Sequence, residues 1–395
     1  MRVLVVGAAG AVGRATARTL AALDSIDGLT LADLDAGGVE ALAGELGPVA
    51  DAQVLDITDG AALRRCLHEH DVVVNTVGPY WLSAEQVLDA AIETRVAYLD
   101  ACDDSAVTVR LLQRRAIARE TGVTAVIGMG LSPGLSNLLA VTAARELEQI
   151  DTLRTGWSVD AGEGGFRTND DLVPRDLEQN PAALLAWLER IRDDIVIAEL
   201  DPPAVLRTME PVHLHYPGIG SGTGWTSGHP EGLTLAASLG IEGPCENVMV
   251  MQRRTAQLLL SVRSRLQDGR LSLHNAALTV MDPTIIDRLR SWTGIAQLPG
   301  GGGLPAFFAV AEGTRDGGQL RVGAQLVTLP SGLDLAAGTT LALTADIIGG
   351  EQAGRGGVRP PELAVEPDIL FGRLAPWCEP PVPTGTLLDV SVEPF

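Results

Sequence analysis

The chain opens with a short apolar strand that runs directly into a glycine-rich turn, and this junction constrains the fold more than any other feature. Residues 2–6 (RVLVV) are apolar, and residues 12–23 carry apolar side chains at helical spacing. Between them, GAAGAVG places a glycine at every third position, which permits a sharp turn, a close backbone approach and tight helix–strand packing. The junction therefore predicts a strand, a tight turn and a helix with an accessible N-terminus.

This turn has the spacing of a dinucleotide-binding loop. The N-terminus of the following helix would offer N–H groups and the positive end of its dipole to a pyrophosphate. We therefore expect cofactor contacts at Gly7, Gly10, Ala11, Val12 and Gly13.

Carboxylates at the ends of the next two predicted strands bear on which dinucleotide is bound. Residues 29–33 (LTLAD) end in Asp33, which would accept hydrogen bonds from ribose hydroxyls and repel a 2′-phosphate. Asp35 is a less well placed alternative. Asp56, after the third strand, is placed to meet the adenine or to form a turn. We predict NAD as the cofactor in preference to NADP.

Strand and helix patterns alternate through the first third of the chain, with further strands expected at 52–56, 71–75, 96–100 and 124–128. The alternation predicts an α/β fold, a doubly wound parallel sheet of the Rossmann type. Ligands of such sheets lie beyond the carboxyl ends of the strands.

The loops NTVGPY, DACDD and GLSPGLSN should accordingly line the reaction site. We expect cofactor contacts at Gly78, Pro79 and Gly130, and substrate contacts at Ser132, Pro133 and Asn137.

The middle of the chain follows a different pattern. Apolar and polar residues alternate at 153–162, 210–218, 246–252, 305–313 and 319–329, while 181–195 and 255–267 have helical spacing. This region predicts an inserted α+β domain with a mixed or antiparallel sheet. We place the first boundary at residues 137/138 and the second at 345/346.

Composition excludes several mechanisms and partners. All 29 basic residues are arginine, so no lysine can form a Schiff base, a P-loop contact or a Tyr-x-x-x-Lys couple. The net charge of −21 argues against nucleic acid or an anionic membrane as a partner. Four scattered cysteines favour a reducing compartment and no metal site. We expect a cytoplasmic protein without a signal peptide or membrane span.

Six segments occur in an order that resembles the saccharopine dehydrogenase/lysine dehydrogenase family. They are GAAGAVG, VNTVGPY, YLDACDD, GMGLSPGLSNLLA, SGHPEGLTL and GGVRPPELAVEPDILFGRLA. The resemblance implies a nucleotide-binding domain, an inserted domain and a final segment, 346–395, that returns to the first domain. It further implies homodimers and hydride transfer at a carbon bound to nitrogen, with Tyr80 and Asp103 or Asp104 facing the substrate.

Two positions depart from the family pattern where substrate would be recognised. Ala84 follows a bulky Trp81 at a position where many relatives have glycine, and Gly232 replaces a frequent proline. These departures predict a substrate that differs from those of characterised relatives.

Amine–imine chemistry needs a hydride carrier, a group for the nitrogen's proton and anchors for substrate carboxylates. Tyr80, Asp103 and Asp104 are candidates for the proton, and His229 in SGHPE could carry a proton or bind a carboxylate. Arg167 is the first candidate for a carboxylate anchor, because guanidinium binds carboxylates in bidentate fashion.

These observations predict an NAD-dependent dehydrogenase or reductase that acts at a C–N bond of an amino acid, an amine or a saccharopine-like adduct. Two alternatives stay open. One is a redox-neutral use of tightly held NAD, as in homospermidine synthase-like chemistry. The other is a regulator that senses NAD(H) without turnover.

Overall fold

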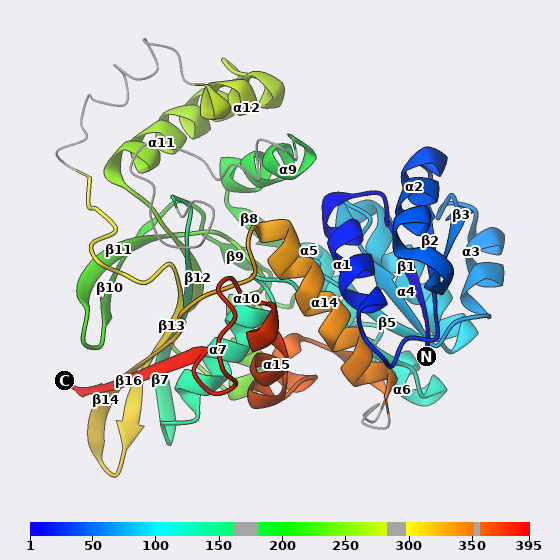
Figure 1. The fold of residues 1–395 in the computed structure, drawn as a ribbon. Helices are drawn as coiled ribbons and strands as arrows, with labels where there is room; N and C mark the ends of the chain where they lie inside the picture. Colours follow the sequence, from blue (N-terminus) through cyan, green and yellow to red (C-terminus); the bar gives the residue numbers. More distant parts are fainter. Residues whose placement is uncertain (161–180, 283–297, 351–355) are drawn as a thin grey trace. The chain divides into compact units, whose positions relative to one another are not determined.

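The computed structural model describes residues 1–160, 181–282, 298–350 and 356–395. It divides the chain into two compact units (Figure 1). The first unit contains Met1–Leu138 and Leu333–Leu387, and the second contains Leu139–Gly332 and Leu388–Phe395. Each unit is therefore built from two separate stretches of the chain.

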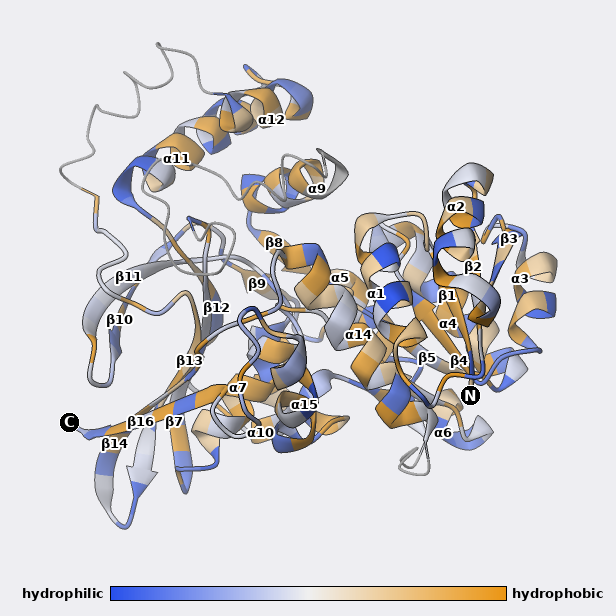
Figure 2. Ribbon diagram, viewed as in Figure 1, coloured by the Kyte–Doolittle hydropathy of each residue, from blue (hydrophilic) through white to orange (hydrophobic). Residues whose placement is uncertain are grey.

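A seven-stranded parallel sheet forms the centre of the first unit, in the order β15-β6-β5-β4-β1-β2-β3. Its strands are β1 (Arg2–Val6), β2 (Gly28–Asp33), β3 (Ala50–Val54), β4 (Val72–Asn75), β5 (Ala97–Asp100), β6 (Thr124–Val126) and β15 (Gly357–Arg359). Residues 3–6 of β1 and 72–74 of β4 are apolar (Figure 2), and all of them are buried, as expected for strands covered on both faces. The chain proceeds outward from β1 to β3 and then crosses to β4, so the strand order reverses between β1 and β4.

Helices connect these strands and cover the sheet. They are α1 (Ala11–Ala21), α2 (Ala36–Leu46), α3 (Gly60–Leu67), α4 (Tyr80–Thr94), α5 (Ser105–Leu112), α6 (Arg115–Thr121), α14 (Leu333–Gly349) and α15 (Pro367–Leu374). The apolar helix α14 packs against α1 with Gly338 at the contact, where a Cβ would lie 2.5 Å from Ala15 Cβ and 2.7 Å from Thr16 N. The absence of a side chain at Gly338 thus permits this close approach.

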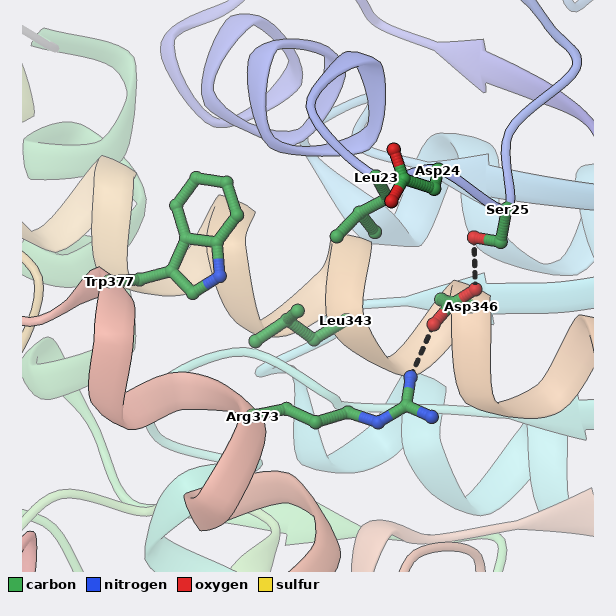
Figure 3. A pocket seen from close by; sticks show the side chains of 7 residues that line it. All are labelled: Leu23, Asp24, Ser25, Leu343, Asp346, Arg373 and Trp377. Atoms are coloured by element: carbon green, nitrogen blue, oxygen red, sulfur yellow. Dashed lines mark hydrogen bonds and ion pairs between the residues drawn. The ribbon is translucent and has the colours of Figure 1, made fainter. Parts of the chain in front are cut away.

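A pocket lies between the end of α1, α14 and α15 (Figure 3). Asp346 of α14 accepts a hydrogen bond from Ser25 and forms an ion pair with Arg373. Because α1 runs back against β1, its C-terminal end lies toward the amino ends of the strands. None of the pocket's lining residues belongs to the loops that follow β1, β4, β5 or β6.

The second unit is built on a seven-stranded mixed sheet in the order β10-β11-β12-β7-β13-β14-β16. Its strands are β7 (Gln149–Ser158), β10 (Pro211–Tyr216), β11 (Gly220–Thr226), β12 (Cys245–Val250), β13 (Phe307–Arg315), β14 (Gly318–Leu326) and β16 (Leu388–Pro394). β12 pairs with β7 in parallel, and the other neighbours are antiparallel. β8 (Ile195–Ile197) and β9 (Ala204–Leu206) form a separate hairpin.

The helices of the second unit contribute a core of their own. They are α9 (Pro181–Arg192), α10 (Glu231–Leu239), α11 (Arg253–Gln267) and α12 (Leu273–Met281). Leu184, Leu188, Leu259 and Val280 are among the buried side chains of this core. α7 (Leu135–Ala144) contains the boundary between the two units.

The predicted fold class is confirmed, whereas the observed units differ from the predicted domain boundaries. The first division falls after Leu138, close to the predicted 137/138. α14 belongs to the first unit, so the second division falls at 332/333 and not at 345/346. The final strand β16 pairs with β14, which places residues 388–395 in the second unit although the segment from 346 was expected in the first. Along the described parts of the chain, no helix has the length and apolar character needed to span a membrane.

Candidate functional site

The glycine loop after β1 has the geometry that its spacing predicts. Gly7 adopts φ +83°, and a Cβ there would lie 2.8 Å from the main chain of Thr76. A Cβ on Gly13 would lie 2.2 Å from Gly7 O, so this position also excludes a side chain. Gly10 is exposed, and its hypothetical Cβ would meet only Gly7 O at 3.3 Å. Two glycines are thus required by packing, while Gly10 leaves the loop surface open.

The same loop presents the N-terminus of α1. Gly10 is the N-cap in extended conformation and no side chain caps the helix. The N–H groups of Ala11, Val12 and Gly13 belong to the first turn, whose donors have no partner within a helix. This arrangement fits the pyrophosphate of a dinucleotide.

The carboxylates that follow β2 and β3 have different partners. Asp33 Oδ2 accepts a hydrogen bond from Ala9 N at 3.0 Å, which places this carboxylate directly beside the glycine loop. Asp35 caps α2 by accepting from Gly38 N at 3.0 Å. Asp56 is exposed and accepts from the main chain and hydroxyl of Thr58, and this hydroxyl hydrogen bond is the main reason that its pKa is lowered. Asp33 is therefore the carboxylate best placed for a ribose.

The loop after β4 leads into α4. Gly78 and Pro79 are exposed, and Pro79 is the N-cap of α4. Tyr80 is the first residue of the helix. Burial raises the pKa of the Tyr80 phenol well above its usual value, and the carboxylates of Asp100 and Asp103 add to the rise. Tyr80 consequently stays protonated and can donate a hydrogen bond at any ordinary pH.

The loop after β5 carries a cluster of acidic groups. Asp100 ends the strand and is fully buried, and burial raises the pKa of its carboxyl to about 6. Cys102 is also fully buried, and burial together with Asp100 and Asp103 raises the pKa of its thiol. Asp103 is half-buried. Asp104 is the N-cap of α5, where its side chain accepts from Val107 N at 2.9 Å.

The loop after β6 is compact and largely buried. Gly128 (φ +70°) and Gly134 (φ +125°) have left-handed backbone conformations, and a Cβ on Gly130 would meet Ala101 Cβ at 3.2 Å. Pro133 is buried and Ser132 is half-buried.

Asn137 lies in the first turn of α7, directly after this loop, and is fully buried. Its Oδ1 accepts from Gly134 N at 3.0 Å, and its Nδ2 donates to Glu362 Oε2 at 2.8 Å. Because both ends of the amide are engaged inside the first unit, this geometry argues against the predicted substrate contact.

β6, β5, β4 and β1 are adjacent in the sheet and run in the same direction. Their carboxyl ends therefore meet at one edge, and the four loops described above lie together there (Figure 1). The candidate cofactor residues and the candidates Tyr80, Asp103 and Asp104 share this edge of the first unit.

His229 belongs to a polar cluster in the second unit. Arg190 Nη1 lies 3.1 Å from His229 Nε2, and because guanidinium can only donate, this nitrogen of the imidazole is the acceptor. His229 Nδ1 lies 3.8 Å from the fully buried Glu231 Oε2, and Asn247 Nδ2 donates to Glu231 Oε1 at 3.0 Å. The ring of Trp157 lies 6.0 Å from the imidazole. A role for His229 in proton transfer stays a prediction, and Arg167 lies outside the described residues.

Three groups in these sites were not singled out from the sequence: the buried Asp100 and Tyr98, and the half-buried Arg190. Asp100 precedes the acidic residues that were chosen, and Tyr98 lies two positions earlier on the same face of β5. A tyrosine and an aspartate alternating in an otherwise apolar strand were the available signal. No sequence feature pointed to Arg190, because an arginine late in an amphipathic helix is usually solvated.

The fold and the glycine loop define a dinucleotide-binding α/β protein with a second, mixed-sheet unit. Residues 3–126 match the model of the family described as "Saccharopine dehydrogenase NADP binding domain". This match supports, over the nucleotide-binding segment, the family resemblance that the motifs predict.

Individual relatives agree with this assignment. The chain is 32% identical over 147 residues to saccharopine dehydrogenase [NADP(+), L-glutamate-forming] of Saccharomyces cerevisiae, covering 37% of this chain and 31% of that one. It is 28% identical over 140 residues to carboxynorspermidine synthase of Vibrio cholerae, covering 31% of this chain and 32% of the relative. The matched segments span about a third of each curated relative.

The solved structure of apo saccharopine dehydrogenase (L-Glu forming) from Saccharomyces cerevisiae has the same fold. It superimposes with a TM-score of 0.63 over 99% of both chains at 17% identity. The likeness thus extends through both units, beyond the segment in which sequence similarity is measurable.

Proposed function

We propose that this protein is an NAD-dependent oxidoreductase that interconverts an amine and an imine at a C–N bond of an amino acid, an amine or a saccharopine-like adduct. The observation that carries the proposal is the acidic loop after β5, which lies at the same sheet edge as the glycine loop. Burial is the main reason that the pKa values of Tyr80 and Cys102 are raised, and the carboxylates of this loop raise them further. A loop of this charge favours a positively charged nitrogen, such as a protonated amine or iminium.

The residues of the first unit fit a dinucleotide. Gly10, with the N–H groups of Ala11 and Val12, would hold the pyrophosphate, and Asp33 would accept from the ribose. Gly78, Pro79 and Gly130 would lie near the reactive end of the cofactor. The bound nicotinamide supplies a hydride acceptor or donor.

The protein's own side chains would handle the proton and the charge. Tyr80 would donate a hydrogen bond to the substrate, because burial raises the pKa of its phenol and keeps it protonated. Asp103 would stabilise the cationic nitrogen and accept its proton as the amine is oxidised. Asp104 is engaged as the cap of α5, so it is the weaker candidate.

The proposed cofactor, NAD, differs from the cofactor that the names of the matched family and relative contain. The family model and the yeast relative both name NADP. Asp33, held beside the glycine loop by its hydrogen bond from Ala9 N, supports NAD because its negative charge would oppose a 2′-phosphate. We also propose a cytoplasmic homodimer, which sedimentation of the purified protein would test.

A spectrophotometric screen at 340 nm tests the reaction class. The purified protein is incubated with NAD or NADP and basic amino acids, diamines or saccharopine, and then with NADH, amines and keto acids. Formation of NADH with one amine would support the proposal. Cofactor that co-purifies and supports turnover without net NADH would indicate the redox-neutral alternative. NAD binding without any turnover would favour the sensing regulator.

Paired variants test the role of the acidic loop. Asp103→Asn should lower kcat by about 10²-fold or more, because it removes the charge and the base, while NADH binding is unchanged. Asp104→Asn is the matched control, since asparagine also caps helices well, and it should retain nearly full turnover. Equal turnover in the two variants would discard the assignment of Asp103.

A further inference from the structure

A continuous chain of buried hydrogen bonds links the three loops that follow β4, β5 and β6. Its central members, Asn75, Ser83, Tyr98 and Asp100, are all fully buried. None of them was among the candidates for direct contact with cofactor or substrate.

Asp100 connects the loop after β5 to the loop after β6. Its Oδ1 accepts from Cys102 N at 3.0 Å and from Gly128 N at 2.7 Å. The main chain adds a third link, because Met129 N donates to Asp100 O at 2.7 Å. One side chain thus fixes main-chain groups of both loops, and these N–H donors would be costly to leave without an acceptor in a buried place.

Tyr98 extends the chain to the loop after β4. Its hydroxyl donates to Asp100 Oδ2 at 2.6 Å and accepts from Asn75 Nδ2 at 3.3 Å. Asn75 Oδ1 accepts from Val77 N at 3.1 Å, and Ser83 Oγ donates to Val77 O at 2.5 Å. The loop that carries Gly78, Pro79 and Tyr80 is therefore connected to Asp100 through two side chains.

We propose that Asp100 is a positioning residue that, through Tyr98 and Asn75, holds the three loops of the candidate site in one arrangement. The contribution of Asp100 to turnover rests on the proposed function, whereas its effect on the positions of the loops does not. Reactive groups lose much of their efficiency when displaced by about 1 Å, so loosening this chain would lower turnover.

The groups around Asp100 are consistent with an acceptor role. Tyr98, Tyr80, Cys102 and Asp103 are the titratable groups that face it. Burial and the charge of Asp103 favour its protonated form, while the hydrogen bonds from Tyr98, Gly128 and Cys102 favour the carboxylate. An asparagine at this position would keep the oxygen that accepts from Cys102 N and Gly128 N.

Two substitutions at residue 100 separate hydrogen bonding from charge. Asp100→Ala should increase deuterium exchange in residues 101–104 and 127–130 and lower turnover about 10-fold or more. Asp100→Asn should restore near wild-type exchange and most of the turnover. Wild-type exchange in Asp100→Ala would overturn the proposal, and so would an Asp100→Asn variant as impaired as Asp100→Ala.

A second pair of variants decides the question if Asp100→Ala does not fold. Tyr98→Phe keeps the ring and removes the hydroxyl between Asp100 and Asn75, so exchange should rise around Val77 and turnover should fall several-fold. Tyr216→Phe is the matched control in the second unit. Tyr216 is also fully buried, and within the described residues its hydroxyl has no hydrogen-bond partner. Unchanged exchange around Val77 in Tyr98→Phe would overturn the proposal.

The exchange experiment needs no substrate. If the wild-type protein turns over none of the amines in the screen, the proposed function fails while the exchange results still decide the role of Asp100. If turnover is found but Asp100→Ala changes neither exchange nor kcat, the positioning role fails and the proposed function stands.

Discussion

Asp33 and Asp35 are only two positions apart, but their carboxylates have different hydrogen-bond partners. Asp33 accepts from the main chain of Ala9 in the glycine loop, and Asp35 caps the helix that follows. The difference follows from position, because the last residue of a strand faces the edge where the loops meet, while the residue before a helix faces its own first turn.

This difference predicts the effect of neutralising each residue. Asp33→Asn should weaken NADH binding and strengthen NADPH binding, shifting the ratio of their Kd values by about 10- to 100-fold, because a charged acceptor is lost and repulsion of a 2′-phosphate is removed. Asp35→Asn should leave the ratio unchanged. Fluorescence titration of both nucleotides measures it, and an equal shift in the two variants would contradict the role given to Asp33.

Asp100 should also make stability depend on pH. Its folded pKa of about 6 is raised from 3.8 by burial. The folded protein therefore binds the proton more tightly than the unfolded chain, and the contribution of this group is full below about pH 4 and is lost as the pH rises past about 6. Relative to wild type, Asp100→Asn should gain up to about 3 kcal/mol in free energy of unfolding between pH 4 and pH 8. Urea unfolding across this range measures the gain, and a difference that is constant with pH would contradict the assignment.

The role of a single residue could be predicted from the sequence where that role depends on its neighbours in the chain. The spacing of Gly7, Gly10 and Gly13 is a local feature, and the structure shows the turn geometry that it predicts. Asn137 depends on Glu362, more than two hundred positions away, and its burial could not be inferred from nearby residues.

At the scale of elements, the contact between α1 and α14 depends on one missing side chain. A Cβ on Gly338 would lie 2.9 Å from Val12 O and still closer to Ala15, so the two helices approach almost backbone to backbone. The helix that presents its N-terminus at the candidate cofactor site is thereby fixed along its length by a helix from the far part of the chain.

Gly338→Ala should therefore destabilise the first unit by about 1–3 kcal/mol, as expected for overpacking of a close contact. Gly44→Ala provides a control of opposite sign. Gly44 is an exposed position in α2 with no atom within 4 Å of the hypothetical Cβ, so alanine should stabilise by about 0.5–1 kcal/mol. Calorimetry measures the stability of both variants. A Gly338→Ala variant as stable as wild type would contradict the close contact between α1 and α14.

Elements with a strong periodic pattern were predictable, and short ones were not. β1 and β4 follow from runs of apolar residues. β15 has three residues, Gly357–Arg359, and is a strand because β6 offers it an edge. β16 alternates only weakly between half-buried and exposed side chains, and it forms a strand because it pairs with β14. Pairing between distant segments leaves little trace in local sequence.

At the scale of the whole molecule, each unit has its own sheet and its own core, and the chain crosses between the units more than once. The approximate place of the first division was predictable because the strand–helix alternation ends there. The later divisions were not, because an apolar helix such as α14 fits either unit by composition.

The two segments of the first unit should respond to cofactor together. NADH at 100 times its Kd stabilises the state that binds it by about 2.7 kcal/mol. Hydrogen exchange should therefore slow in β1, in β4 and also in α14, although α14 is distant in sequence from every candidate cofactor residue. Protection confined to residues 1–138 would contradict the assignment of α14 to this unit. Exchange in β13 and β14 serves as the internal control.

The split of the first unit between two stretches of chain has a consequence for synthesis on the ribosome. When Leu138 has been translated, β6 lacks its neighbour β15 and α1 lacks α14. Roughly 200 further residues must be added before α14 emerges, which takes about 10–40 s at the usual rates of elongation. During that interval the apolar face of α1 and the edge of β6 are exposed while the inserted unit is being made. The amino-terminal segment of this protein should for that reason bind chaperones that recognise exposed apolar surface, and release them only when the last fifth of the chain arrives.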